Sequence, residues 1–251
     1  MRLALMACAA VLLVASCSTG PRLPQFQTKP GDRVGILVDI GETPSHVHIG
    51  TTVSLDFEKD YPYHWNLSAD VKDAVRNAFS SAGYSVVDLR GEGFSYRDLE
   101  NLVVRDSATW KIAPDKEAIA RRLTERLGVK VVVVVKQAKS VVEIECPKAD
   151  CTYHVVYGPG LYTRSFLGFT NYSAVAAFKW NVFVLNPPAD TAAVDPLASE
   201  LQVSRVRLED FPHPSDFQNI GAAEFVPVHD AIVHFVEKEA VRAARTVAGD
   251  G

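Results

Sequence analysis

Hydrophobic and polar residues in the first half of the chain follow two patterns, one typical of strands and one typical of helices. Arg33–Ile40 is an apolar run of strand length, and Val129–Glu145 starts with a run of valines, which is typical of a central strand buried on both faces. Val71–Ala82 and Pro114–Leu127 carry apolar residues at helical spacing, and a glycine follows each. With a short strand at Tyr84–Leu89, the pattern predicts strand, helix, strand, helix, strand.

Three local predictions fill the gaps in this half. His46–Glu58 contains two short alternating stretches, which indicate further strand. Ser68 is expected to cap the first helix, because its hydroxyl can accept a hydrogen bond from a free amide. Tyr96–Val104 is assigned to a helix on its apolar spacing.

The second half has strand character and ends in a helix. Cys151–Tyr157, Tyr162–Phe169 and Tyr172–Leu185 alternate with period two, and Pro227–Val247 is an amphipathic helix. A loop is expected over 186–196, followed by a strand over 199–208 with a bulge. We therefore expect an α+β (mixed α/β) fold: one domain over 32–248, with a central mixed sheet, an antiparallel extension and about three helices.

The N-terminus has the features of an export signal. Residues 1–16 combine Arg2 with an apolar run that is too short to span a bilayer, so they are expected to form a signal peptide. The sequence Val14-Ala15-Ser16-Cys17 resembles the lipobox of bacterial lipoproteins. This resemblance implies cleavage before Cys17 and acylation, palmitate included, of that cysteine, whereas an ordinary cleaved signal is the alternative.

The resemblance also implies a location. Ser18 follows the lipidated cysteine, where aspartate commonly signals retention in the inner membrane, so the outer membrane is expected, with the domain on its periplasmic face. Residues 17–31 are polar and rich in proline, and they are expected to form a flexible tether.

The composition and the absence of known motifs argue against several functional classes. The 251 residues are 47% hydrophobic, which excludes a disordered chain, and 26 basic against 30 acidic residues argue against nucleic-acid binding. The chain contains no P-loop, GxGxxG, GxSxG, SxxK or HExxH motif. No cofactor, metal or catalytic residue is therefore assigned, and an enzyme is not expected.

The element order of this predicted lipoprotein resembles a family of periplasmic envelope domains. The family includes the curli secretion lipoprotein, the lipoprotein activators of peptidoglycan synthases and the N-terminal domain of the Tol-system β-propeller protein. The resemblance covers residues 33–142, through Val34–Ile40, Gly83-Tyr84 after the first helix, Gly128 after the second, and Val129–Val135. It implies a binding or assembly role. The segment His46–Trp65 and the strands after Cys151 depart from the family pattern.

Cys146 and Cys151 flank a four-residue loop between two predicted strands, so a hairpin would bring them within disulfide range in the oxidising periplasm. His46 and His48 lie two apart on a predicted strand and face the same side, where a metal site completed by His64 is one interpretation and plain polar positions are the other. Glu143 and Glu145 share a strand face and are expected to be solvated.

Two aromatic clusters are the candidate binding residues: Tyr61, Tyr63 and Trp65 in one loop, and Phe166, Phe169 and Tyr172 in another. Aromatic loops suit protein or glycan contacts, whereas covering the end of the core is the alternative. The sequence thus favours an envelope binding module anchored by its lipid, whose partner is an envelope protein or the cell wall. An envelope enzyme or metal-binding protein is the second hypothesis. A secretion pore subunit, with Leu161–Leu185 as a membrane hairpin, is the third.

Overall fold

The valine-rich strand β7 (Val129–Gln137) is the centre of a five-stranded mixed sheet. Strands β1 (Arg33–Asp39) and β4 (Ser85–Asp88) continue the sheet on one side, and all pairs among these three strands are parallel. On the other side, β12 (Phe178–Leu185) and then β13 (Pro188–Asp190) are antiparallel. The two crossovers between parallel strands explain why the first half of the chain alternates strand and helix.

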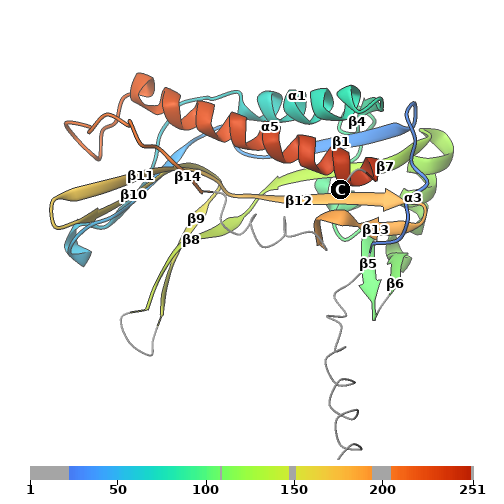
Figure 1. Cartoon of the computed structure of the whole chain (residues 1–251), viewed down its shortest axis with the longest axis horizontal. Helices are drawn as coiled ribbons and strands as arrows, with labels where there is room; N and C mark the ends of the chain where they lie inside the picture. The colour runs from blue at the N-terminus through green and yellow to red at the C-terminus, as the bar shows by residue number, and fades with distance from the viewer. Residues whose placement is uncertain (1–22, 108, 147–150, 194–204, 250–251) are drawn as a thin grey trace, which may run out of the picture.

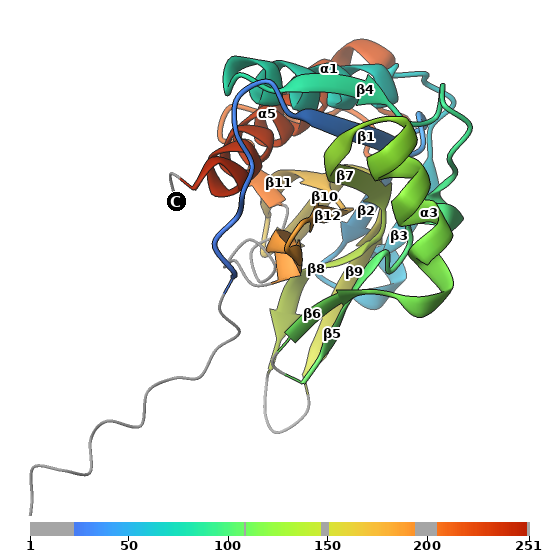
Figure 2. The same cartoon turned by 90° about the vertical axis from the view of Figure 1, so that its right-hand side faces the viewer.

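The computed structural model describes residues 23–107, 109–146, 151–193 and 205–249. Helices α1 (Leu67–Ser81) and α5 (Val226–Ala248) lie side by side over one face of this sheet (Figure 1). The opposite face is covered by α3 (Glu117–Arg121), which continues as one π-helical stretch over Arg122–Arg126, as Figure 2 shows.

Both faces of β7 are buried, as the valine run predicts. Val131, Val133 and Val135 belong to the core beneath α1 and α5. Val132 and Val134 belong to the core on the α3 side, which also holds Leu123. The ribbon formed by β5 (Val103–Asp106) and β6 (Thr109–Ile112) borders this second core.

A second five-stranded sheet has the order β14-β11-β10-β2-β3. Its strands are β2 (Ser45–Ile49), β3 (Phe57–Asp60), β10 (Pro159–Phe166), β11 (Phe169–Ala176) and β14 (Arg205–Arg207). Neighbouring strands are antiparallel except for β2 and β10, which run parallel. The N-terminal half of α5 packs against this sheet, so the helix joins the two sheets into one unit.

The chain passes between the sheets at one junction. The amide of Ala138 donates to the carbonyl of Ala177, that of Gly158 donates to Ala138, and that of Ala177 donates to Gly158. Past this junction, β8 (Lys139–Glu145) and β9 (Thr152–Tyr157) form a separate antiparallel ribbon. The predicted long strands 129–145 and 172–185 are therefore two strands each, whereas the alternation of Ala174–Val184 keeps one buried face throughout.

Two predicted helix boundaries are wrong. Helix α1 begins at Leu67, one residue before Ser68, and Asn66 precedes it with φ 54°, a left-handed conformation that asparagine tolerates. The amide of Ser68 donates to the carboxylate of Glu42 at 3.1 Å, so a side chain distant in sequence supplies the cap. This acceptor also places a negative charge at the positive end of the helix.

The predicted helix over 96–104 is only one turn, α2 (Tyr96–Leu99). Asn101 has φ 55° and turns the chain, after which Val103 and Val104 pair with Ile112 and Lys111. β-branched residues fit such a pleated pair better than a helix, which explains the difference. The predicted loop over 186–196 contains β13, because the buried carboxylate of Asp190 accepts hydrogen bonds from Asn181 and from the amide of Val182.

The expected single α+β domain is confirmed, and so is the C-terminal helix. The expected central mixed sheet is present, and the strands expected to extend it form a second five-stranded sheet and the separate β8–β9 ribbon. The signal peptide, Cys17 and most of the bulged strand 199–208 lie outside the described residues. No helix in the described part of the chain is both long and apolar enough to cross a membrane.

The predicted tether is not free along its whole length. Phe26 packs against the core beneath α1 and α5, and the hydroxyl of Thr28 donates to the carbonyl of Val247 at 2.7 Å. The amide of Gly31 donates to the carbonyl of Gly83. From Phe26 onward, this segment is therefore part of the folded domain.

Candidate binding surface

The first predicted aromatic cluster is mainly structural. Tyr61 is 2% exposed, and Tyr63 and Trp65 are half-buried against the core. The hydroxyl of Tyr61 donates to the carbonyl of Gln218 at 3.0 Å, and that of Tyr63 donates to Ile220 at 2.9 Å. Burial raises the pKa of Tyr61, so it remains a neutral donor. Burial of Tyr61 fits the alternative that these rings cover the end of the core, whereas Tyr63 and Trp65 stay partly exposed.

A shallow hollow of about 460 Å³ remains beside Tyr63 and Trp65, and His64 contributes to its wall. His229 on α5 closes it, with its Nε2 3.1 Å from a carboxylate oxygen of Asp70 and its ring against Trp65. This contact joins α5 to α1, so His229 lies at the boundary between the two helices.

The second aromatic cluster separates into an inner and an outer part. Tyr172 is buried, stacks on Phe217, and its hydroxyl lies 2.6 Å from Nδ1 of His213. Phe166 and Phe169 lie instead at the tip of the β10–β11 hairpin, with 59% and 80% of their surfaces exposed. Tyr172 is therefore not available as a binding residue, whereas both phenylalanines are.

The hairpin tip is part of a larger apolar end of the molecule. Leu167, between the two phenylalanines, is 71% exposed. Because β2 runs parallel to β10, the turn after β2 lies at the same end, and its Val53 is 86% exposed. Arg164 donates to the carbonyl of Gly50 at 2.7 Å and links the two turns. We call this end the apolar tip; its exposed residues are Val53, Leu55, Phe166, Leu167 and Phe169.

His46 and His48 face the same side of β2, as predicted, but they are buried. Nε2 of His46 and Nδ1 of His48 each lie 2.7 Å from Oγ1 of Thr163, and Nδ1 of His46 lies 3.1 Å from the carbonyl of Phe217. Burial, and to a lesser extent His48, lower the pKa of His46 to about 3, so its ring is neutral at pH 7.

These hydrogen-bonding partners determine which ring nitrogens carry a proton. A carbonyl only accepts, so Nδ1 of His46 carries the proton, and its Nε2 accepts from the Thr163 hydroxyl. The same hydroxyl oxygen then accepts from Nδ1–H of His48. Both histidines are thereby engaged in a polar chain within the sheet. Within the described residues, no group of three or more His, Cys, Asp or Glu side chains is arranged to hold a metal ion, and His64 lines the separate hollow beside Trp65.

Glu143 and Glu145 do share a face, but they are not simply solvated. The hydroxyl of Tyr162 donates to Glu143 at 2.7 Å, and Arg164 forms an ion pair with Glu145. Arg205 on β14 lies 3.6 Å from Glu143. These contacts surround a hollow of about 160 Å³ whose lining also includes Asn171, Ser173 and Arg207. Three guanidinium groups face two carboxylates here, so the hollow carries a net positive charge.

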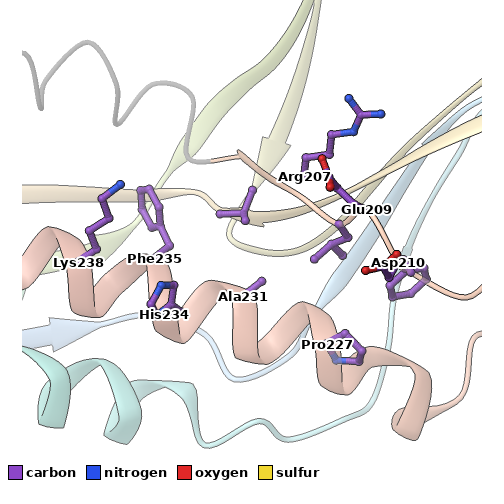
Figure 3. Close-up of a pocket in the computed structure, with 11 residues that line it drawn as sticks. Arg207, Glu209, Asp210, Pro227, Ala231, His234, Phe235 and Lys238 are labelled. Atoms are coloured by element: carbon purple, nitrogen blue, oxygen red, sulfur yellow. The ribbon is translucent and has the colours of Figure 1, made fainter.

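An apolar depression lies between α5 and β14 (Figure 3). It has a volume of about 480 Å³, and one wall is the α5 face that includes Pro227, Ala231 and Phe235. The other wall is the chain from Val206 to Phe211. We call it the α5–β14 groove. Its helical wall spans twelve residues, from Pro227 to Lys238, which corresponds to about 16 Å.

Charged side chains stand at the rim of the groove and not on its floor. In Figure 3, Arg207 and Glu209 point away from α5, whereas Ala231 and Phe235 border the depression. Lys238 stands at one end of the helical wall. The result is an apolar channel beside a strand at the edge of a sheet.

Sequence reasoning missed the groove. The helical stripe of Ile232, Val236 and Ala240 is buried in the core. The signal for a second surface is the pair Ala231 and Phe235, which extends the apolar arc of the helix beyond that stripe. The partner wall could not be inferred, because β14 is placed beside α5 by its pairing with β11, which the local sequence does not show.

The disulfide prediction is confirmed, since Cys146 and Cys151 are bonded with an S–S distance of 2.08 Å. Comparison with known protein families, with curated proteins and with solved structures finds no match to this chain.

Proposed function

We propose that this chain is a lipid-anchored module of the bacterial outer membrane that binds another envelope component on its periplasmic face. Binding, and not catalysis, is its activity, and neither a cofactor nor a metal takes part. The α5–β14 groove is the docking surface. Lipidation at Cys17 holds the domain at the membrane and raises the effective concentration of the partner site there.

One observation carries the proposal: an open apolar groove of about 480 Å³ between α5 and β14, separate from the apolar tip. Contiguous apolar depressions that are rimmed by charge mark sites of protein or ligand contact. The polar groups that such a site needs for orientation are present at the rim, in Arg207, Glu209 and Lys238.

The anchor is tested by fractionation of cells that express the full chain. We expect the protein in the outer-membrane fraction, and we expect the Cys17→Ser variant in the soluble periplasm or in an unprocessed precursor. A protein that stays at the outer membrane without Cys17 would remove the lipid from the proposal.

Docking is tested by a photo-crosslinking amino acid placed at His234, an exposed position on the groove wall. We expect one dominant adduct in cells, and we expect Ala231→Gln, which fills the groove, to abolish it. The matched control is Ala118→Gln on the exposed surface of α3, which should leave the adduct unchanged. No adduct, or an adduct that is insensitive to Ala231→Gln, would contradict the proposal.

A further inference from the structure

We propose that the occupant of the α5–β14 groove is an extended peptide segment with alternating apolar and acidic side chains, which adds to β14 as a further strand. This inference rests on the proposed function, because it names the partner chemistry of the same site. Three properties of β14 carry it: the direction of its free backbone groups, its apolar face and its basic face.

Within the described residues, the backbone of β14 has unpaired groups at the edge of the sheet. The amide of Leu208 donates to the carbonyl of Tyr172, which makes these two a hydrogen-bonded pair. In an antiparallel ladder such pairs alternate with non-bonded ones, so the register Ser173↔Arg207 and Val175↔Arg205 belongs to the second kind. The N–H and C=O groups of both arginines therefore point away from β11.

These groups offer a template for an added strand. Strand β11 is the neighbour of β14 within the described residues, and β14 ends the order of its sheet. An extended peptide satisfies such an edge through main-chain hydrogen bonds, which supply affinity, while alternate side chains supply specificity. The length of the groove suits this geometry, because about 16 Å of helical wall accommodates about five extended residues.

One face of the added strand would lie in the apolar groove. Val206 and Leu208 point toward the core beneath α5, and side chains opposite them would lie against Ala231 and Phe235. A volume of about 480 Å³ holds several aliphatic side chains. These positions of the peptide are therefore expected to be apolar.

The other face would meet the arginines. Arg205 and Arg207 alternate with the apolar residues and line the hollow of about 160 Å³, together with Arg164. Arg164 forms an ion pair with Glu145, and Arg205 forms one with Glu143. A guanidinium group has five N–H donors, so a further carboxylate can still accept hydrogen bonds from these arginines. Glu209 is the next side chain on this face and disfavours an acid opposite it, which fixes the register of the peptide.

The same charges argue against a second copy of this chain as the occupant. Two β14 strands paired edge to edge would bring arginines of one copy against arginines of the other, and like charges on facing strands destabilise a pair. An acidic and apolar segment from a different chain satisfies both faces.

The test uses an acetylated and amidated peptide, Ser-Val-Glu-Val-Glu-Val-Ser, with the soluble full domain. We expect the peptide to bind and to slow hydrogen exchange of the Arg205 and Arg207 amides at least tenfold. The counterpart with lysine at both glutamate positions should bind at least tenfold more weakly. The variant Arg205→Glu/Arg207→Glu should reverse this preference.

Arg207→Glu alone is a second variant, since no ion pair of this side chain is present within the described residues. It should weaken acidic-peptide binding without lowering thermal stability. Equal affinity for the acidic and basic peptides, binding without protection of the two amides, or no binding would each overturn the inference. If the crosslink at His234 forms in cells but the peptide does not bind, the proposed docking function stands and the proposed partner chemistry is wrong. If the peptide binds but no crosslink forms in cells, the proposed docking function is contradicted.

Discussion

His46 and His48 share a single hydrogen-bonding partner: a nitrogen of each ring lies 2.7 Å from Oγ1 of Thr163. The hydroxyl donates to one ring and accepts from the other, so its loss leaves both nitrogens unsatisfied in a buried place. We expect Thr163→Val to lower the free energy of unfolding by roughly 3 kcal/mol and Thr163→Ser by less than about 1 kcal/mol. Urea unfolding of both variants measures the difference, and equal losses would contradict the shared-hydroxyl arrangement.

Protonation of the same cluster should make the fold sensitive to acid. The pKa of His46 is about 3 in the folded protein, mainly because of burial, against an ordinary value of 6.5. A lowered pKa means that the unfolded chain binds the proton first, so the contribution is complete above pH 6.5 and is lost as the pH falls toward 3. Burial also lowers the pKa of His48, which acts in the same direction.

We therefore expect the free energy of unfolding to fall by about 2 kcal/mol between pH 7 and pH 5. The His46→Gln variant should lose much of this dependence, whereas His234→Gln, at an exposed position, should keep it. Unfolding titrations at each pH give the comparison. A stability that is constant over this range would show that His46 is not held neutral.

Tyr61 and Phe169 come from the two aromatic clusters and should respond oppositely to truncation. Tyr61 is buried against Phe225, so Tyr61→Ala should lower the free energy of unfolding by about 3 to 5 kcal/mol. Phe169→Ala should change it by less than about 0.5 kcal/mol, because the side chain is exposed. Thermal unfolding distinguishes the two, and a large loss from Phe169→Ala would mean that the hairpin tip is packed.

The apolar tip should determine how long the folded protein is retained on an apolar chromatography matrix. We expect Leu167→Ser/Phe169→Ser to elute earlier from a hydrophobic-interaction column with an unchanged melting temperature. Lys111→Ser on the exposed β5–β6 ribbon is a control that should not alter retention. Unchanged retention of the double variant would show that the tip is not the dominant apolar surface.

The disulfide should stabilise the end of the β8–β9 ribbon and not the rest of the domain. Cys146 and Cys151 close a short loop at the far end of the β8–β9 ribbon, for which the chain-entropy relation gives about 2 kcal/mol. We expect Cys146→Ser/Cys151→Ser to speed amide exchange at Glu145 and Thr152, while β7 keeps its protection. Exchange measured residue by residue tests this, and uniform acceleration across the domain would contradict it.

The sequence predicts best where burial is uniform. Five consecutive valines identify β7 because a strand covered on both faces has no polar position. The breaks at Ala138 and Ala177 escape prediction, because neither residue is a breaker and the alternation of apolar positions stays in phase across Ala177. Only the pairing of distant strands decides that the chain changes sheets there.

The candidate site shows the same limit. The strand predicted over 162–169 runs through Leu167 and Gly168, where the structure has the hairpin turn that exposes Phe166 and Phe169. Burial of Tyr61 could not be predicted either, because its partners, the carbonyl of Gln218 and the ring of Phe225, lie more than 150 residues further along the chain. The wall that β14 builds opposite α5 is equally invisible without the sheet order.

Under the proposed lipidation of Cys17, the contact between Thr28 and Val247 would give the molecule an orientation relative to the membrane. Because the chain is held against the end of α5 from Phe26 onward, a lipid at Cys17 would be separated from Phe26 by a tether of at most about 30 Å. In Figure 1 this end of the domain lies opposite the hairpin of β10 and β11. In a lipidated molecule, the end of the domain that holds Thr28 and Val247 would therefore lie nearest the membrane. Phe166 and Phe169 would lie farthest from the lipid, on the side facing the periplasm.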